Sequence, residues 1–118
     1  MSVESILFDA VKGLVSNRAY PDFAPANVQM PYITYQQISG RSVVYTTSEL
    51  PNKKNGRFQF NVWATTRAQA NSISLAIEAA LIALTTVQAE PLGSFTALSD
   101  KDLKTYGAMQ DFSVWSDR

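Results

Sequence analysis

The stretch RFQFNVWATTRAQANSISLAIEAAL, residues 57–81, decides the fold class because its hydrophobic period changes partway along. Over residues 57–64 the even positions are apolar, while the odd positions include Gln59, Asn61 and Trp63. That alternation is typical of a half-buried antiparallel strand. Apolar residues then recur every three or four positions, which predicts a helix that begins after Thr65 or Thr66 and runs to about Leu84.

This predicted helix carries a wide apolar stripe. Its charged residues are Arg67 and Glu78 alone. A helix that is apolar around so much of its circumference is buried on more than one side. We therefore expect one flank of the helix to face a second subunit instead of water.

The chain begins with another amphipathic helix. Ser2 is the expected N-cap, and apolar residues at spacings of three and four continue to Leu14. Residues 17–30 contain two prolines and show no periodicity, which predicts a long connector. Apolar and aromatic side chains in this connector are expected to pin it to the core, namely Tyr20, Phe23 and Val28.

Two strands and a loop are predicted between the connector and residue 57. Residues 32–38 are rich in β-branched and aromatic residues, which favours a strand. Residues 41–47 predict its partner in a hairpin. Residues 48–56 are interpreted as a polar, exposed loop, because the Asn55-Gly56 dipeptide favours a tight turn.

The chain after the long helix is again predicted to form strands. We expect a short strand at residues 94–98, a charged turn at residues 100–104 and a last strand at residues 106–115. The order helix, strands, helix, strands predicts a single α+β domain over residues 1–118. In this domain two helices cover one face of a mainly antiparallel or mixed sheet, and a hairpin loop extends from it.

The sheet face away from the helices carries Trp63 and Trp115. Two interpretations of these tryptophans remain open. Either they are exposed and mark a contact surface, or the connector of residues 17–30 folds over them.

Composition excludes several classes of function. The 118 residues include ten Lys plus Arg and ten Asp plus Glu, so there is no cationic excess for nucleic acid or an anionic membrane. The absence of cysteine and histidine excludes disulfides, thiol nucleophiles, Cys/His zinc sites and histidine bases. We expect a soluble protein without a signal peptide or membrane span, and we expect no cofactor and no bound metal.

Three small clusters of residues are candidate sites. Asp100 and Asp102 are interpreted as a solvated turn, because a hard cation needs about six oxygen ligands. The basic cluster of Lys53, Lys54 and Arg57 indicates either a contact with DNA or an acidic partner protein, or an ordinary loop tip. Tyr32 and Tyr35, with Trp63, lack the interleaved basic residues of a nucleic-acid stacking platform and favour core or interface.

An enzyme is the weakest hypothesis. It would have to rely on carboxylates and lysines, for instance Glu78 or Asp111 beside a lysine, and the spacing of these residues does not call for such a pocket.

Four strings resemble one protein family in the right order along the chain. They are SVESILFDAVKGL (residues 2–14), NRAYPDFAPANVQMPYITYQQISG (17–40), the stretch 57–81 quoted above, and QDFSVWSD (110–117). Together they are similar to the tail completion, or tail terminator, proteins of long-tailed bacteriophages, which join tail to head.

The resemblance implies a non-enzymatic structural subunit of the virion, assembled in the host cytoplasm. It implies a hexameric ring at the head-proximal end of the tail that stops tube polymerisation. The implied partners are further copies of the chain, the tail-tube protein and the head–tail connector or stopper protein. The resemblance also implies that the ring contacts DNA only while DNA passes through its lumen, and that it binds no membrane. The alternative is a small protein-binding module that acts as an adaptor or regulator.

A closed ring needs two different, complementary patches on each subunit. We expect one patch on the loop 47–57 with Arg41 and the other along the long helix, giving as candidates Arg41, Glu49, Lys53, Lys54, Asn55, Arg57, Arg67 and Glu78. The candidates for contact with the tube or the connector protein are Arg18, Tyr20, Asp22, Phe23, Trp63 and Trp115.

Overall fold

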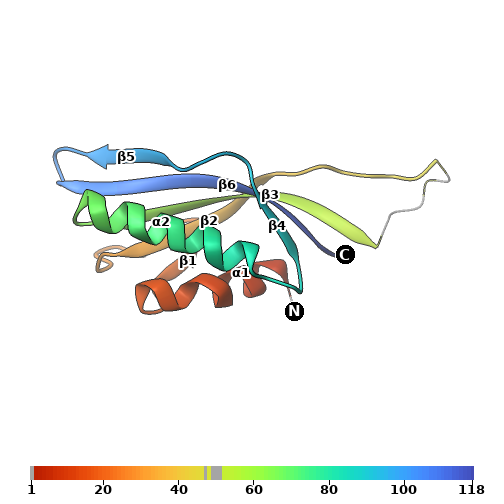
Figure 1. The fold of residues 1–118 in the computed structure, drawn as a ribbon, viewed down its shortest axis with the longest axis horizontal. Helices are drawn as coiled ribbons and strands as arrows, with labels where there is room; N and C mark the ends of the chain where they lie inside the picture. The colour runs from red at the N-terminus through yellow and green to blue at the C-terminus, as the bar shows by residue number, and fades with distance from the viewer. Residues whose placement is uncertain (1, 47, 49–51) are drawn as a thin grey trace.

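The structure is a computed structural model that describes residues 2–46, 48 and 52–118. Two α-helices pack against each other on one face of a mixed, mostly antiparallel sheet, which confirms the predicted α+β class (Figure 1). Among these residues, neither helix is long and apolar enough to cross a membrane. The elements, in chain order, are α1 (Val3–Val11), the 3-10 helix η1 (Lys12–Val15), β1 (Ala19–Pro21), β2 (Tyr32–Ser39), β3 (Lys53–Ala64), α2 (Arg67–Ile82), β4 (Gln88–Pro91), β5 (Thr96–Asp100) and β6 (Thr105–Asp117).

The sheet is organised around β3 and β6, which pair along the full length of β3 from Lys53 to Ala64. The strand order is β1-β2-β3-β6-β4, and β1 with β2 is the parallel pair. β5 pairs with the N-terminal half of β6 and β4 with its C-terminal half, so together they form one interrupted edge strand. At the interruption the Leu92 N–H donates to the Asp111 carbonyl at 2.9 Å.

The core lies between the sheet and the helices. The predicted alternation of β3 is confirmed, because Phe58, Phe60, Val62 and Ala64 are all buried. Phe60 stacks on Tyr35 and meets Phe112 edge-on, each with a ring-centroid distance of 5.7 Å. Helix residues complete this core, including the fully buried Leu7 and Leu81.

Both helices begin where the sequence predicts. The Ser2 hydroxyl accepts from the Ser5 N–H, and the Thr66 hydroxyl accepts from the Gln69 N–H, each at 3.1 Å. Each cap satisfies one backbone donor of a first helical turn. The α-helical part of the first segment ends at Val11 and continues as η1.

The predicted second hairpin strand is wrong. Residues 41–46, the described part of that segment, pair with no other strand, and in Figure 1 the chain leaves the sheet after β2. Thr47 and Glu49–Pro51, which belong to the predicted strand and loop, lie outside the described residues.

The predicted tight turn at Asn55-Gly56 is also wrong. Both residues lie inside β3, opposite Trp115 and Val114 of β6. The Asn55 side chain donates to the Ser113 hydroxyl at 2.9 Å and accepts from the Arg41 N–H at 3.0 Å. The pairing of β3 with β6 and the hydrogen bonds of the Asn55 side chain stabilise the extended conformation more than the local preference of Asn-Gly stabilises a turn.

The short edge strands differ most from the prediction. β5 begins and ends two residues later than the predicted 94–98 strand. β4 was not predicted, and neither was β1, which lies inside the expected connector. Each of these strands is five residues or fewer, and it forms because a longer neighbour offers unpaired backbone groups.

The packing of the three phenylalanines predicts a large effect of Phe112→Ala. Phe112 is fully buried, so the truncation removes its transfer free energy and leaves a cavity, and we expect a loss of about 3–5 kcal/mol in the free energy of unfolding. Urea denaturation measures this loss. Phe23→Ala, at a side chain 80% exposed, should change stability by no more than ~0.5 kcal/mol. Equal effects of the two variants would contradict the described core.

Candidate functional site

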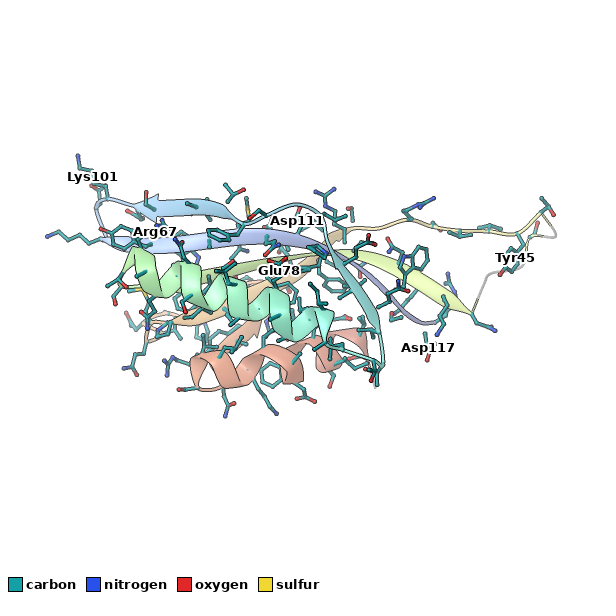
Figure 2. The ribbon with its side chains drawn as sticks, viewed as in Figure 1. Tyr45, Arg67, Glu78, Lys101, Asp111 and Asp117 are labelled. Atoms are coloured by element: carbon teal, nitrogen blue, oxygen red, sulfur yellow. The ribbon has the colours of Figure 1, made fainter. Side chains whose placement is uncertain are left out.

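An arm projects from one end of the molecule. We define the arm as residues 40–46, which follow β2 away from the sheet to the far tip where Tyr45 lies (Figure 2). Val44 is 57% exposed and Tyr45 is 54% exposed. At the root of the arm, next to β2, the Arg41 N–H donates to the Asn55 side chain and so holds the arm to β3. It therefore presents apolar side chains that the described body does not cover.

The basic residues near the arm root are mostly neutralised within the chain. Lys53 forms an ion pair with Asp117, and Arg57 donates through Nε and Nη2 to one oxygen of Asp111 at 3.0 and 2.7 Å. Both pairs join β3 to β6 on the sheet face away from the helices. The hydrogen bond and the charge of Lys53 lower the pKa of the Asp117 carboxyl below its usual range.

Three basic residues still meet in one shallow groove beside the arm root. Arg41, Lys54 and Arg118 line it together with polar side chains of β2 and β3. Of the predicted interface residues, Arg41, Lys54 and Asn55 are therefore brought together. Glu49 lies outside the described residues.

Arg67 lies far from this group and holds the fold together. Its guanidinium donates to the Gly107 carbonyl at 2.7 Å, to the Leu98 carbonyl and to Asn71, and it lies over the Tyr106 ring. It thus fastens the first turn of α2 to β5 and β6, a role that its sequence position does not reveal.

The outer side of α2 is uncovered and mostly apolar. We define the α2 stripe as five exposed positions at spacings of three and four, namely Ala68, Ser72, Leu75, Ala79 and Ile82. Leu75 is 55% exposed and Ile82 is 54% exposed. Glu78 is half-buried on the flank of the stripe. Exposed apolar residues arranged in this way are typical of a protein contact.

The connector presents one large exposed aromatic side chain. Phe23 is 80% exposed, so the expectation that it pins the connector to the core is wrong. Asp22 has a positive φ of 67° and its N–H donates to the Tyr35 carbonyl, and this sharp turn directs Phe23 outward. Tyr20 on β1 is half-buried, and Arg18 donates to the Pro31 carbonyl at 2.9 Å, which closes the two ends of the connector.

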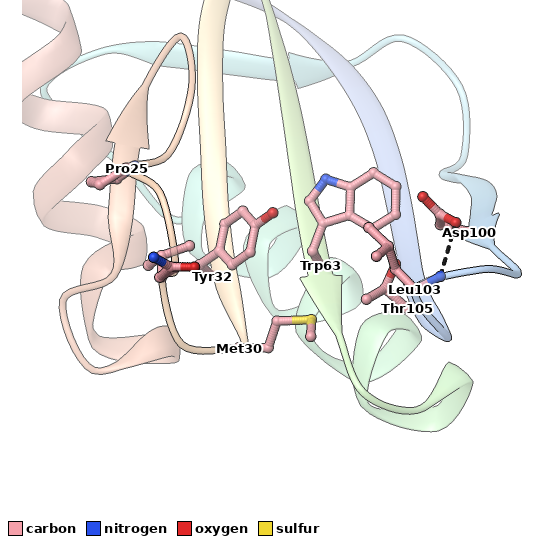
Figure 3. A pocket seen from close by; sticks show the side chains of 9 residues that line it. Pro25, Met30, Tyr32, Trp63, Asp100, Leu103 and Thr105 are labelled. Atoms are coloured by element: carbon pink, nitrogen blue, oxygen red, sulfur yellow. Dashed lines mark hydrogen bonds between the residues drawn. The ribbon is translucent and has the colours of Figure 1, made fainter.

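The two tryptophans have different surroundings. Both are half-buried, so neither is fully exposed. Trp63 lies in a groove of about 310 Å³, the Trp63 groove, which connector residues share (Figure 3). Trp115 is bordered instead by Lys53 and residues 85–88. The groove is lined by Pro25, Asn27, Val28, Met30, Tyr32, Trp63, Asp100, Leu103 and Thr105.

A glycine forms the floor beneath Trp63. Gly107 is its cross-strand partner, and a Cβ at position 107 would lie 2.9 Å from the indole Cε3 atom and 3.0 Å from the Val62 carbonyl oxygen. The indole therefore occupies the space that any other residue would fill. Sequence reasoning missed Gly107, although a glycine inside a strand pattern signals a close approach.

The two tyrosines considered as stacking platforms lie on opposite sheet faces, because they are three positions apart in one strand. Tyr35 is buried in the core, whereas Tyr32 borders the Trp63 groove. Burial raises the pKa of both hydroxyls, and the charges of Glu4 and Asp22 raise that of Tyr35 further. They form no joint platform.

The carboxylate of Asp100 closes a turn. Its Oδ1 atom accepts from the N–H groups of Asp102 and Leu103 at 3.1 and 3.2 Å. Across residues 2–46, 48 and 52–118, no group of three carboxylates is placed to hold a metal ion. The predicted charged turn at residues 100–104 is present at residues 101–104.

Comparison with known proteins gives a family and a fold. The family model described as "Tail completion protein gp17" matches residues 8–117. A chain in a solved structure described as the virion of a native gene transfer agent particle is similar, with 14% sequence identity and a TM-score of 0.63 over 99% of this chain and 96% of that one. This likeness is one of fold. No curated protein matches the sequence.

The glycine floor predicts the effect of Gly107→Ala. In a Trp115→Phe background, where Trp63 is the remaining tryptophan, the added methyl should push the indole outward. We expect a red-shifted emission and a loss of about 1–3 kcal/mol in the free energy of unfolding. Gly13→Ala is the matched control, since a Cβ there meets no atom within 4 Å. An unchanged emission spectrum for Gly107→Ala would contradict this packing.

The Lys53–Asp117 pair predicts a titration. In the wild type, NMR of the side-chain carboxyl carbon should give Asp117 a pKa below the ordinary value of about 3.9. The stability from the pair is then present at neutral pH and is lost as the pH falls through that lowered pKa. Lys53→Met should return the pKa to the ordinary range, whereas Lys54→Met should leave it unchanged. The same pKa in all three proteins would argue against the pair.

Proposed function

Since this chain belongs to the tail completion protein family, and is thus a structural protein of the bacteriophage tail, we propose that it forms a hexameric ring at the head-proximal end of the tail. The ring ends polymerisation of the tail tube and joins the tube to the head connector. The observation that carries this proposal is the match of the family model to residues 8–117.

The surface supports a ring because it offers two unlike, uncovered patches. The arm extends from one end of the molecule, and the α2 stripe lies on the helical layer. A ring in which every subunit contacts its neighbours in the same way uses heterologous contacts, in which two different patches meet. The long axis of 54 Å, against 26 and 23 Å for the others, lets one copy reach across a neighbour.

Two further aromatic side chains, one exposed and one half-buried, are candidates for the axial contacts of the ring. Phe23 projects from the turn after β1, and Trp115 lies half-buried near the C-terminal end of β6. We propose these two side chains for contact with the tube protein or the connector protein. Arg18, Tyr20 and Asp22 shape the segment that presents Phe23.

The charge distribution suits a lumen through which DNA passes without being held. The formal net charge is zero, and two basic side chains near the arm root are already paired with carboxylates. Strong binding to the phosphate backbone requires a cationic excess over an extended surface, which a net charge of zero does not provide, and the groove of Arg41, Lys54 and Arg118 is assigned no role in holding DNA. Transient contact is therefore expected.

Negative-stain microscopy of the purified chain, alone and mixed with the tail-tube protein of the same phage, tests the proposal. Rings, or tubes closed at one end, are the expected result. Monomers that leave the tubes open and growing would refute the ring and favour an adaptor that binds another protein.

The α2 stripe predicts an assembly defect without unfolding. Ile82→Glu places a charge in the stripe, where burial against a neighbour would desolvate it, so rings should be lost while the circular dichroism spectrum is retained. Asp9→Asn changes the charge by one on the neighbouring helix and should leave rings intact. Normal rings from Ile82→Glu would exclude the stripe from the interface.

A further inference from the structure

The tip of the arm and the Trp63 groove lie at opposite ends of the molecule. Figure 2 shows Tyr45 at one extreme and Lys101 at the other, and Lys101 lies between the groove residues Asp100 and Leu103 in the chain. With a long axis of 54 Å, the arm of a copy cannot enter its own groove. Two copies aligned head to tail, however, bring one arm tip to the other copy's groove.

The groove has the chemistry of a receptor for one aromatic side chain. Its walls are the rings of Trp63 and Tyr32 and the apolar side chains of Met30, Val28 and Leu103. A volume of about 310 Å³ lies at the lower end of the range of small-ligand pockets, so it suits a side chain better than a large cofactor. Figure 3 shows the indole and phenol rings beside the groove with Asp100 at its far end.

Asp100 supplies one polar anchor in this groove. Its Oδ1 atom is used by the turn, whereas its Oδ2 atom accepts no hydrogen bond from the described part of the chain. Oδ2 is not buried, so it is open to a hydroxyl donor that enters the groove. A phenol has both the apolar ring and that donor.

The arm offers this ligand. Tyr45 is 54% exposed, and its hydroxyl donates to no atom of the described residues. Shape and hydrogen-bond donor therefore agree between the arm tip and the groove.

We propose that Tyr45 of one copy occupies the Trp63 groove of the next copy, with its hydroxyl donating to Asp100. Val44 covers the rim of the groove beside it. The inference rests on the proposed ring and refines its contacts. The tip of the arm meets the Trp63 groove and not the α2 stripe, which is left to contact another part of the neighbouring copy. Trp63 then contacts a neighbouring subunit and leaves the axial contacts to Phe23 and Trp115.

Cross-linking tests the contact, because the chain has no cysteine of its own. Thr46→Cys and Leu103→Cys proteins, both changed at exposed positions, are mixed in equal amounts, assembled with tail tubes and treated with a short bismaleimide. We expect a product that joins position 46 of one copy to position 103 of another. Gln88→Cys, exposed near Trp115, replaces Leu103→Cys as the control and should give no product with position 46.

A second set of variants tests the role of the ring and its hydroxyl. Adding Tyr45→Ser to the Thr46→Cys protein should lower the yield of the 46–103 product at least ~10-fold, because aromatic anchors dominate interface energies. Tyr45→Phe removes only the donor and should weaken association about tenfold. Thr46→Ala, the neighbouring exposed position, should alter it less than ~2-fold.

The outcomes separate this inference from the proposed function. Rings that form without the 46–103 product, or that give it equally with Tyr45→Ser, overturn the groove contact and leave the ring intact. If no rings or closed tubes form, both proposals fail. Rings with a product that depends on Tyr45 support both.

Discussion

The ladder between β3 and β6 is the constraint on which the structure depends. Every residue of β3, from Lys53 to Ala64, has a partner in β6. Because side chains alternate between the two faces of a strand, this ladder places Phe58, Phe60 and Phe112 beneath the helices. The same alternation places Trp63 and the Arg57–Asp111 pair on the opposite face. A shift of one residue in the register would turn each side chain of the shifted strand to the other face of the sheet. The buried core and the Arg57–Asp111 pair would then both be lost.

Sequence reasoning found the elements whose signal is local and repeated. The alternation in residues 57–64, the two capped helices and the last strand are all present, because burial of a periodic apolar face decides them. It failed where partners distant in sequence decide the outcome. Asn55-Gly56 reads locally as a turn but lies in the ladder, and β1 and β4 exist only because longer strands lie beside them.

The candidate site could be predicted only in outline. The apolar composition of the long helix predicts an uncovered flank, and Leu75 and Ile82 are exposed there. The arm was not predictable in this way, because residues 41–46 have the composition of a strand. The roles of single charged residues do not follow from the sequence. Arg67 holds α2 to the sheet, while Lys53 and Arg57 are neutralised by carboxylates 64 and 54 residues further along the chain. Gly107 is needed because Trp63 packs against it, and only the pairing of the strands reveals this contact.

The interrupted edge strand has a consequence for the protein before it assembles. On one side of the sheet, β4 and β5 are separated by residues 92–95, and on the other, β1 is three residues long. Short and broken edges offer no continuous row of backbone donors and acceptors to a second sheet, so they discourage open-ended fibre growth. These edges therefore make generic strand pairing between free copies unfavourable, so the proposed joining of copies would have to depend on side chains and the arm.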